Sequence, residues 1–208
     1  MTRPFAIVDY GVGNVRSAQK AFEAVGQPAE ITSDPHRIAA APAVVLPGQG
    51  AFGTCMRNLR AAALDEPVLR AIDSGRPFLG ICIGMQLLFE GSDESPGVAG
   101  LGVLRGRVVR FPRDPERKVP HMGWNQLRIV RRAPALADVA DGAWVYFVHS
   151  YYAQPADASV VATTTSYGLE FASSVARDNL YAGVFHPEKS QRVGLALIRS
   201  FVAQAAGR

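Results

Sequence analysis

The sequence predicts a single α/β domain built on an open, mixed and mostly parallel sheet flanked by helices. Two observations support this fold class. The first half of the chain alternates short apolar runs with amphipathic stretches, which is the pattern of strand–helix–strand units around a parallel sheet. The second half contains strand-length runs rich in β-branched and aromatic residues, and we expect these runs to complete the same sheet.

In the first half, each apolar run is expected to form a strand and each amphipathic stretch a helix. The expected strands are residues 5–9, 43–46 and 77–81, and the expected helices are residues 14–25, a region between the last two strands, and residues 84–90. Asn14 is the expected N-cap of the first helix, because its side chain can accept a bond from a backbone N–H. Gly26 is the expected stop of that helix.

The second half is expected to contain further strands and a closing helix. The strands are predicted at residues 103–111, 126–130, 144–148, 160–165, 171–176 and 181–185, and the helix at residues 188–206. Residues 92–102 and 112–120 are expected to be surface loops. The sequence contains no internal repeat and no linker, so one domain is expected over residues 1–208.

Length and composition are those of a globular protein. The 208 residues are 48% hydrophobic and 19% charged, which lies outside the regime of disordered chains. The N-terminus lacks the extended apolar region of a signal peptide, and no run approaches the roughly 20 apolar residues that cross a bilayer. We therefore expect a cytoplasmic protein that makes no membrane contact. In that reducing compartment, Cys55 and Cys82 are expected to be free thiols.

The segment Gly80-Ile81-Cys82-Ile83-Gly84 has the pattern of a nucleophile elbow. Cys82 stands between two glycines, after one expected strand and before an expected helix. Flanking glycines permit the tight strand-to-helix turn that presents a nucleophile, and a helix N-terminus favours the thiolate. By itself, a Gly-x-Cys-x-Gly sequence is more often a buried structural cysteine, so the assignment depends on its context.

A base for this nucleophile is found far downstream, in Phe185-His186-Pro187-Glu188. This segment follows another apolar strand, so a parallel sheet can bring His186 close to the cysteine. Glu188 lies two residues further on, across a stiff proline, and can hold the imidazole and stabilise its charged form. Taken alone, His-Pro-Glu is a surface turn that starts a helix.

A third motif, Pro47-Gly48-Gln49-Gly50, follows the expected strand 43–46. Its glycines permit backbone conformations in which an amide points at a developing oxyanion, with the amide of Ile83 as the second donor. By itself this motif is only a turn. The three motifs nevertheless occur at the ends of successive strands of one predicted sheet, where open α/β folds place their sites. Together they predict a cysteine nucleophile with a histidine base.

The combination resembles the class I (triad) glutamine amidotransferases over essentially the whole chain. The family pattern Gly-x-Cys-x-Gly-x-Gln matches residues 80–86, its His-x-Glu pattern matches His186 and Glu188, and its Pro-Gly-x-Gly pattern matches residues 47–50. The resemblance implies a flavodoxin-like fold and a glutaminase. In such an enzyme Cys82 would attack the side-chain amide of glutamine and form a glutamyl thioester. His186 would protonate the leaving amine and then activate water.

Three further segments are similar to one branch of the family, in which the glutaminase passes ammonia internally to a (β/α)8-barrel cyclase. They are residues 9–14 with Ser17, residues 121–125 and residues 146–151. By matching position, the amides of Gln49 and Ile83 would form the oxyanion hole, and the oxyanion peptide would stay misoriented until the partner binds its own ligand. The residues that would hold the substrate L-glutamine are Gly50, Gln86, Glu94, Ser150 and Tyr151. The residues that would face the cyclase are Asn14, Met122 and Trp124.

Two positions depart from the family pattern. Gln49 stands where the family usually has valine, and Val184 stands where it usually has glutamine. Neither departure replaces a residue of the expected Cys-His-Glu triad.

Other chemistries are not expected. The four histidines have no metal-ligand spacing, so no metal and no cofactor is predicted. Residues 11–16 lack the third glycine of a dinucleotide fingerprint, because Arg16 stands in its place. The basic-rich stretch 105–132 has no aromatic interleaving, which disfavours nucleic acid and indicates a solvated or partner-facing edge. Cys55 is expected to serve in core packing.

Three alternative interpretations stay open on the sequence. The chain can be a glutaminase that supplies ammonia for aminodeoxychorismate, anthranilate or guanylate synthesis. It can be a scaffold that has kept the fold without the activity, although an intact Cys82, His186 and Glu188 disfavour this. It can also be a cysteine peptidase of similar fold, although Gln86 and the Pro-Gly-x-Gly loop suit a small amide better.

Overall fold

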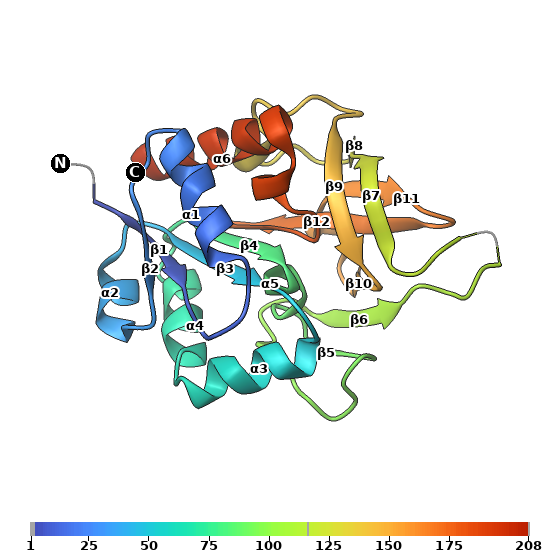
Figure 1. Ribbon diagram of the computed structural model, residues 1–208, viewed down its shortest axis with the longest axis horizontal. Coiled ribbons are helices and arrows are strands. Elements are labelled where there is room, and N and C mark those ends of the chain that lie inside the picture. Colours follow the sequence, from blue (N-terminus) through green and yellow to red (C-terminus); the bar gives the residue numbers. More distant parts are fainter. Residues whose placement is uncertain (1–2, 116, 208) are drawn as a thin grey trace.

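The centre of the molecule is an 11-stranded sheet, seen in a computed structural model that describes residues 3–115 and 117–207. The strand order along its main path is β2-β1-β3-β4-β13-β12-β10-β6-β5 (Figure 1). All pairings among the first five strands of this path are parallel. These strands are β2 (Ala29–Thr32), β1 (Phe5–Val8), β3 (Val44–Gly48), β4 (Phe78–Cys82) and β13 (Leu180–Gly183).

The remaining strands pair antiparallel, except that β5 and β6 are parallel. They are β12 (Glu170–Arg177), β10 (Tyr151–Pro155), β6 (Gly106–Arg110), β5 (Gly91–Ser92), β11 (Val161–Ser166) and β8 (Arg128–Ile129). A separate antiparallel pair is formed by β7 (His121–Gln126) and β9 (Trp144–His149). The predicted mixed sheet is therefore confirmed, with its parallel part built mainly from the first half of the chain.

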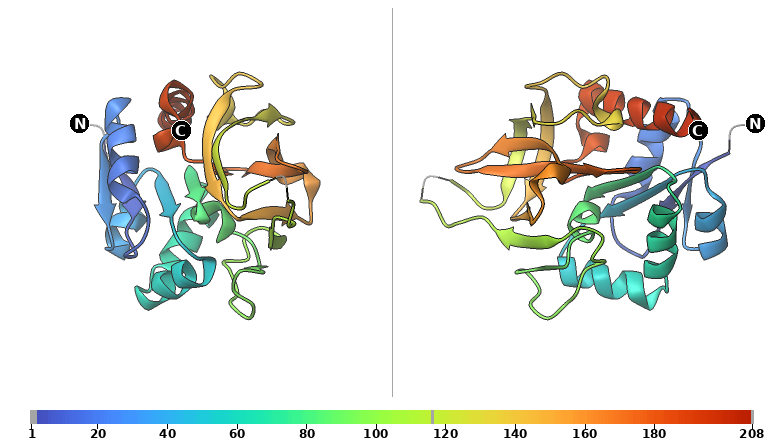
Figure 2. Two further views of the ribbon diagram at one scale, coloured as in Figure 1. Left: turned by 45° about the vertical axis from the view of Figure 1, so that its right-hand side comes forward. Right: turned by 180° about the vertical axis from the view of Figure 1, so that it is seen from behind.

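Helices cover both faces of the parallel part of the sheet. α1 (Val15–Ala24) and α6 (Gln191–Ala206) lie on one face, and α3 (Phe52–Ala61) and α4 (Asp65–Asp73) lie on the other (Figure 1). α2 (Pro35–Ala40) packs against α4. The remaining elements are the short α5 (Ile83–Gln86) and the 3-10 turns η1 (Pro134–Leu136), η2 (Ala158–Val160) and η3 (Pro187–Lys189). Figure 2 shows the antiparallel strands gathered at the end of the molecule away from the N-terminus.

An aromatic cluster joins the sheet to the helices α1 and α6. The ring of Phe5 in β1 lies 5.8 Å from Phe22 of α1 and 6.0 Å from Phe201 of α6, both in edge-to-face contact. All three side chains are almost fully buried. Such pairs add about 0.5–1.5 kcal/mol to the burial of their apolar area, so this cluster fixes how both helices sit on the sheet.

Several strands differ from the sequence prediction. β2, β5, β10 and most of β7 were not predicted, and β6 begins at Gly106 rather than at residue 103. The predicted strand 126–130 is two elements, because β7 ends at Gln126 and β8 starts at Arg128. β7 contains a glycine and polar residues of weak strand propensity, so its conformation depends on its pairing with β9.

Three helix predictions need correction. The helix expected at 84–90 is the single turn α5, because the N–H groups of Leu88 and Phe89 bond to carbonyls three residues back and end the helix. The closing helix starts at Gln191 rather than at residue 188. The backbone changes conformation there, because Gln191 has a positive φ of 48°. Asn14 precedes α1 but its side chain makes no capping hydrogen bond. Gly26, at φ +83°, ends that helix as predicted.

Candidate active site

The three sequence motifs meet at one edge of the sheet. β3, β4 and β13 are parallel neighbours with β4 in the middle. In register, Gly48 of β3 lies beside Cys82, and Gly183 of β13 lies beside Ile81. The carboxyl ends of parallel strands meet at the same edge of a sheet. The segments that follow them, which carry Gln49 and His186, are therefore brought to the same place as Cys82.

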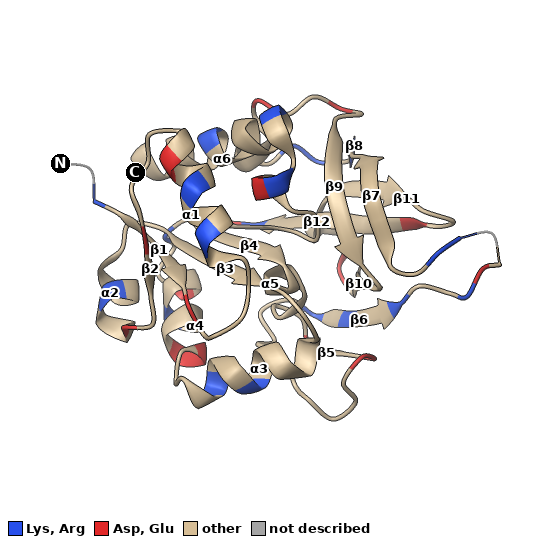
Figure 3. Ribbon diagram, viewed as in Figure 1, with Lys and Arg blue, Asp and Glu red and all other residues tan. Residues whose placement is uncertain are grey.

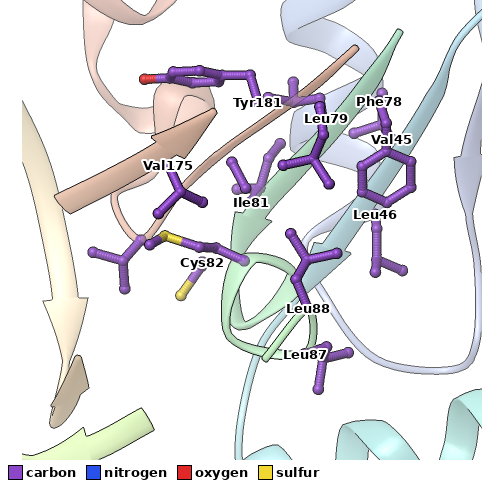
Figure 4. Packing of buried hydrophobic residues seen from close by; sticks show 14 of the residues in the cluster. Val45, Leu46, Phe78, Leu79, Ile81, Cys82, Leu87, Leu88, Val175 and Tyr181 are labelled. Carbon is purple, nitrogen blue, oxygen red and sulfur yellow. The ribbon is translucent and has the colours of Figure 1, made fainter. Parts of the chain in front are cut away.

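Cys82 occupies a strained turn between β4 and α5. Its backbone has φ 55° and ψ −115°, a positive φ that residues with a side chain rarely adopt. The turn requires glycine at position 84, where a Cβ would lie 1.9 Å from the carbonyl oxygen of Leu46. Figure 4 shows Cys82 at the carboxyl end of β4, at the edge of a buried cluster that includes Ile81 and Leu88. The geometry is that of the predicted nucleophile elbow.

His186 and Glu188 form a buried hydrogen-bonded pair. The Nδ1 atom of His186 lies 2.8 Å from Oε1 of Glu188, and the two side chains are 3% and 2% exposed. Glu188 lies in η3, which follows His186 directly. The backbone of His186 is held as well, because its N–H donates to Tyr146 O at 2.9 Å and its carbonyl accepts from the Ser190 hydroxyl at 2.6 Å. The ring is therefore fixed from several sides.

This arrangement determines how the imidazole carries its protons. A carboxylate only accepts hydrogen bonds, so Nδ1 carries the hydrogen and Nε2 is the nitrogen that can take a proton. Nε2 is buried and has no hydrogen-bond partner among the described residues. Burial opposes the charged ring, but the Cys82 thiolate and the Glu188 carboxylate outweigh it and raise the pKa of His186 to about 10. The site therefore favours the protonated form of the His186 ring.

A pocket of about 320 Å³ lies over this edge of the sheet. Cys82 and His186 line it, while Glu188 stands behind the imidazole. The pocket brings together all of the other residues expected in the oxyanion hole and around the substrate, which are Gln49, Ile83, Gly50, Gln86, Glu94, Ser150 and Tyr151. It is also lined by residues that sequence reasoning did not single out, namely Pro120, Val148, His149 and Lys189. The position of Lys189 in the pocket could have been predicted, since it directly follows the His-Pro-Glu motif in the sequence.

Two of the lining side chains have defined hydrogen bonds. Gln86 donates from Nε2 to Tyr151 O at 3.2 Å, and its Oε1 is buried with no partner among the described residues. Glu94 accepts the N–H of Phe52 through Oε2 at 2.7 Å, at the first residue of α3. The wall of the pocket thus contains a side chain with a buried, unpartnered amide oxygen, Gln86, and a side chain with an anchored carboxylate, Glu94. Both are acceptors that suit a cationic group of a ligand.

The loop after β3 is held from behind by two buried side chains. Tyr10 donates from its hydroxyl to Pro47 O at 2.7 Å, and Cys55 donates from its thiol to Gln49 O at 3.4 Å. Burial raises the pKa of both groups, so both stay protonated and can donate. Cys55 lies in the core as expected, but the sequence contains no local signal for its bond to the loop.

The two departures from the family pattern lie in different environments. The side chain of Gln49 is exposed and lines the pocket, while the main chain of that residue is held by Cys55. Val184 is buried in the core, and its N–H donates to Ser173 O at 3.0 Å. Among the described residues, neither side chain forms a hydrogen bond with His186.

The residues expected to face a partner lie at the surface. Met122 and Trp124 of β7 are 61% and 44% exposed, and Asn14 is half-buried before α1. The register of β7 and β9 places Trp144 on the same face as Trp124, and Trp144 is 52% exposed. Sequence reasoning had missed Trp144 as a surface residue. The exposed face of the β7–β9 pair is thus apolar, which is typical of an interface.

Much of the basic-rich stretch is paired locally. Figure 3 shows its charges along β6 and the loop that follows. Arg107 pairs with Asp93 at 3.2 Å, and Arg128 pairs with Glu170 at 3.3 Å. Arg131 and Arg132 donate to backbone carbonyl groups. These ion pairs are exposed to solvent, and the solvated or partner-facing role of the stretch stays a prediction.

No group of three or more His, Cys, Asp or Glu side chains in residues 3–115 and 117–207 could hold a metal ion. Over the same residues, every helix is too short or too polar to traverse a bilayer.

Comparison with known proteins agrees with this geometry. The model of the glutamine amidotransferase class-I family matches residues 6–205, and the chain therefore belongs to that family. Solved structures share the fold, among them PurLQS from Thermotoga maritima, with a TM-score of 0.76 and 19% identity over 98% of this chain and 99% of that one. A structure titled glutamine amidotransferase gives a TM-score of 0.75 at 20% identity, over 97% and 98% of the two chains.

Within the family, the similar curated proteins are subunits named HisH of imidazole glycerol phosphate synthase. The Geobacter sulfurreducens protein is 56% identical over 94% of this chain and 96% of its own length. The Methanothermobacter thermautotrophicus protein is 52% identical over 95% and 96% of the two chains. The family and enzyme class predicted from the sequence are confirmed, and the chain is a glutamine amidotransferase.

Proposed function

We propose that this chain is the cytoplasmic glutaminase subunit of an imidazole glycerol phosphate synthase, with Cys82 as nucleophile, His186 as base and acid, and Glu188 as the group that orients the base. The observation that supports these roles most directly is the 2.8 Å bond between His186 Nδ1 and Glu188 Oε1. It leaves Nε2 as the nitrogen that exchanges protons beside Cys82. The names of the relatives add the synthase to which such a glutaminase belongs.

The reaction proceeds through a covalent intermediate. Cys82 gives its proton to His186 Nε2, and the thiolate attacks the side-chain carbonyl carbon of glutamine. The N–H groups of Gln49 and Ile83 stabilise the oxyanion that forms. The imidazolium then returns the proton to the leaving nitrogen, so ammonia departs and a glutamyl thioester remains. Water attacks the thioester while His186 takes its proton, and glutamate leaves as the thiol is reprotonated.

The pocket has the groups needed to bind glutamine as a zwitterion. The free Oε1 of Gln86 and the carboxylate of Glu94 accept hydrogen bonds from the α-ammonium group of the substrate. Lys189 stands at the rim as a cation for the α-carboxylate. The remaining wall is formed by Gly50, Ser150 and Tyr151. A volume of about 320 Å³ is large enough for one amino acid.

The partner is a (β/α)8-barrel cyclase that docks on the exposed face of the β7–β9 pair and beside Asn14. Met122, Trp124 and Trp144 give this face large exposed apolar side chains, and tryptophan is enriched among the residues that dominate binding energies. The ammonia made in the pocket passes internally to the cyclase. The cyclase uses it to convert a phosphoribulosyl formimino carboxamide ribonucleotide into imidazole glycerol phosphate and aminoimidazole carboxamide ribonucleotide, for histidine biosynthesis.

The proposal is tested by glutaminase activity with and without the cyclase and its ligand. We expect strong stimulation by the partner, and complete loss of activity in the complex that contains Cys82→Ala. A glutamine-analogue alkylator is expected to label Cys82 and to leave Cys55 unmodified, as read by mass spectrometry. Retained glutaminase activity in Cys82→Ala would contradict the proposed chemistry. Failure to complement a histidine auxotroph, with activity intact, would contradict the proposed synthase.

A further inference from the structure

We propose that two buried histidines, His121 and His149, form a polarised hydrogen-bond relay that positions the substrate-binding amide of Gln86 from the partner-facing strand β7. The inference rests on the proposed function, because it assumes that Gln86 holds glutamine. His121 is the first residue of β7 and His149 is the last residue of β9, and the two are paired in register. Both are buried, and the relay uses neither of them as an acid or a base.

The first step fixes the hydrogen on His149. Its Nδ1 atom lies 2.9 Å from Tyr151 O, and a carbonyl can only accept, so Nδ1 carries a hydrogen. In a neutral ring, Nε2 must then be an acceptor. His121 Nδ1 lies 3.0 Å from that nitrogen and donates to it. The orientation of the second histidine thus follows from the carbonyl of Tyr151.

The relay continues to a third side chain on β7. Because His121 donates from Nδ1, its Nε2 is an acceptor, and Asn125 Nδ2 lies 3.3 Å away to donate to it. Asn125 also donates to Ser166 O at 2.9 Å, which fixes which end of its amide carries the hydrogens. Every bond in the chain therefore points the same way, from Asn125 toward Tyr151.

The rings are neutral and held in place, as this pattern requires. His121 is stacked between Phe147 and Tyr167, with centroid separations of 4.7 Å and 4.0 Å. Burial lowers the pKa of His121 to about 4 and that of His149 to about 3. Neither ring carries a charge near neutral pH, so neither adds a second donor that would break the chain.

The relay ends at the substrate pocket. Tyr151 O accepts a second hydrogen bond, from Gln86 Nε2 at 3.2 Å. Since the amide nitrogen faces Tyr151, the oxygen of Gln86 is left as the buried acceptor without a partner among the described residues. His149 and Gln86 both line the pocket. His149 thus fixes the carbonyl that fixes Gln86, and both histidines are positioning residues.

The other end of the relay lies under the proposed docking face. Successive side chains of a strand point to opposite sides. Met122 and Trp124 are exposed on one side of β7, whereas His121 and Asn125 point to the other side, where His121 is buried. A partner that presses on the exposed face of β7 therefore acts on the strand that carries two members of the relay. The structure places a rigid polar connection between that strand and the substrate amide.

His121→Phe is the most informative variant, because a phenyl ring keeps the stacking between Phe147 and Tyr167 and removes only the hydrogen bonds. We expect the KM for glutamine in the assembled complex to rise about fivefold, which corresponds to about 1 kcal/mol. The kcat and the rate of Cys82 alkylation by iodoacetamide are expected to stay within about twofold of the wild type. His121→Gln can again donate to His149 and accept from Asn125, so it is expected to restore much of the affinity. The exposed His36→Gln is the matched control.

Two further measurements separate positioning from a merely structural role. In a Gln86→Ala background, His121→Phe is expected to raise KM no further, since the relay acts through Gln86. Long-range proton–nitrogen spectra of the rings at pH 7 are expected to show both histidines neutral with the hydrogen on Nδ1. The inference is overturned if folded His121→Phe keeps the wild-type KM, if its effect is additive with Gln86→Ala, or if either ring has the other tautomer. Failure of the proposed function would be seen separately, as glutaminase activity that survives Cys82→Ala.

Discussion

Replacing Glu188 by glutamine tests the orienting carboxylate with the smallest change in shape. The side chain is 2% exposed and accepts the His186 Nδ1–H through Oε1 at 2.8 Å. Its second oxygen, Oε2, is buried with no hydrogen-bond partner among the described residues. A glutamine at this position has two possible orientations of its amide. Each orientation has a cost that follows from this geometry.

With the amide oxygen toward His186, the NH2 group replaces Oε2 at a buried place without an acceptor, and such a donor costs about 1–3 kcal/mol of stability. With the NH2 group toward the ring, Nδ1 must accept, so the hydrogen moves to Nε2 and the ring cannot take the proton of Cys82. Either way, loss of the carboxylate charge lowers the pKa of His186, which Cys82 and Glu188 together raise to about 10. Since general acid–base catalysis contributes about 10²–10⁴-fold, we expect kcat to fall by about that factor.

The measurement is steady-state glutaminase activity of the assembled complex at several pH values. KM is expected to change little, because Glu188 stands behind His186 and does not line the pocket. Glu23→Gln on the exposed side of α1 is the matched control and should leave kcat unchanged. Thermal unfolding establishes that both variants fold. A folded Glu188→Gln with kcat within about threefold of the wild type would refute the reasoning, since something else would then orient the imidazole.

Three further predictions concern the frame of the site. Gly84→Ala places a Cβ 1.9 Å from a backbone oxygen of β3, so kcat should fall about 100-fold or more by misplacement of the nucleophile, as read in the same assay. Tyr10→Phe leaves Pro47 O without its donor and should lower the free energy of unfolding by about 1 kcal/mol, as measured in urea. In the activity assay, the decrease in kcat should be larger than any change in KM. Stability should also fall as pH drops from about 6.5 toward 4, by up to about 1.4 kcal/mol per pH unit for each depressed histidine, because the unfolded chain binds more protons there. Urea titrations over this range should show a smaller slope in His121→Phe, since the two groups concerned are His121 and His149.

The sequence contains enough information to assemble the candidate site, because its three motifs follow parallel strands. Strand β4 carries Cys82, and its neighbours β3 and β13 lead to Gln49 and His186. Apolar runs and glycines mark where each of these strands ends. Parallel pairing then brings residues that are far apart in the sequence to one edge. The spacing between Cys82 and His186 carried no structural information by itself.

Features that depend on the exact path of the backbone or on strand pairing could not be predicted. The bond from Cys55 to Gln49 O crosses from α3 to the loop before it, and nothing around Cys55 distinguishes it from a core cysteine. β7 has weak strand propensity and forms through pairing with β9. Its sequence therefore does not show the apolar–polar alternation that predicts a strand. The expected cap at Asn14 failed because a cap depends on φ and ψ as well as on residue type, and Asn14 has ψ 56°.

Two neighbouring positions of the loop after β3 differ in the space that they offer a side chain. A Cβ at Gly48 would lie 2.7 Å from Ile83 Cβ and 2.8 Å from Gly84 N, so a side chain there would push the loop away from the elbow. At Gln49 the side chain is exposed, while the main chain is held by Cys55. The proposed oxyanion donors are both main-chain amides. We therefore expect the donor at position 49 to depend on the placement of the backbone, and we expect glutamine in place of the usual valine to leave that donor in place.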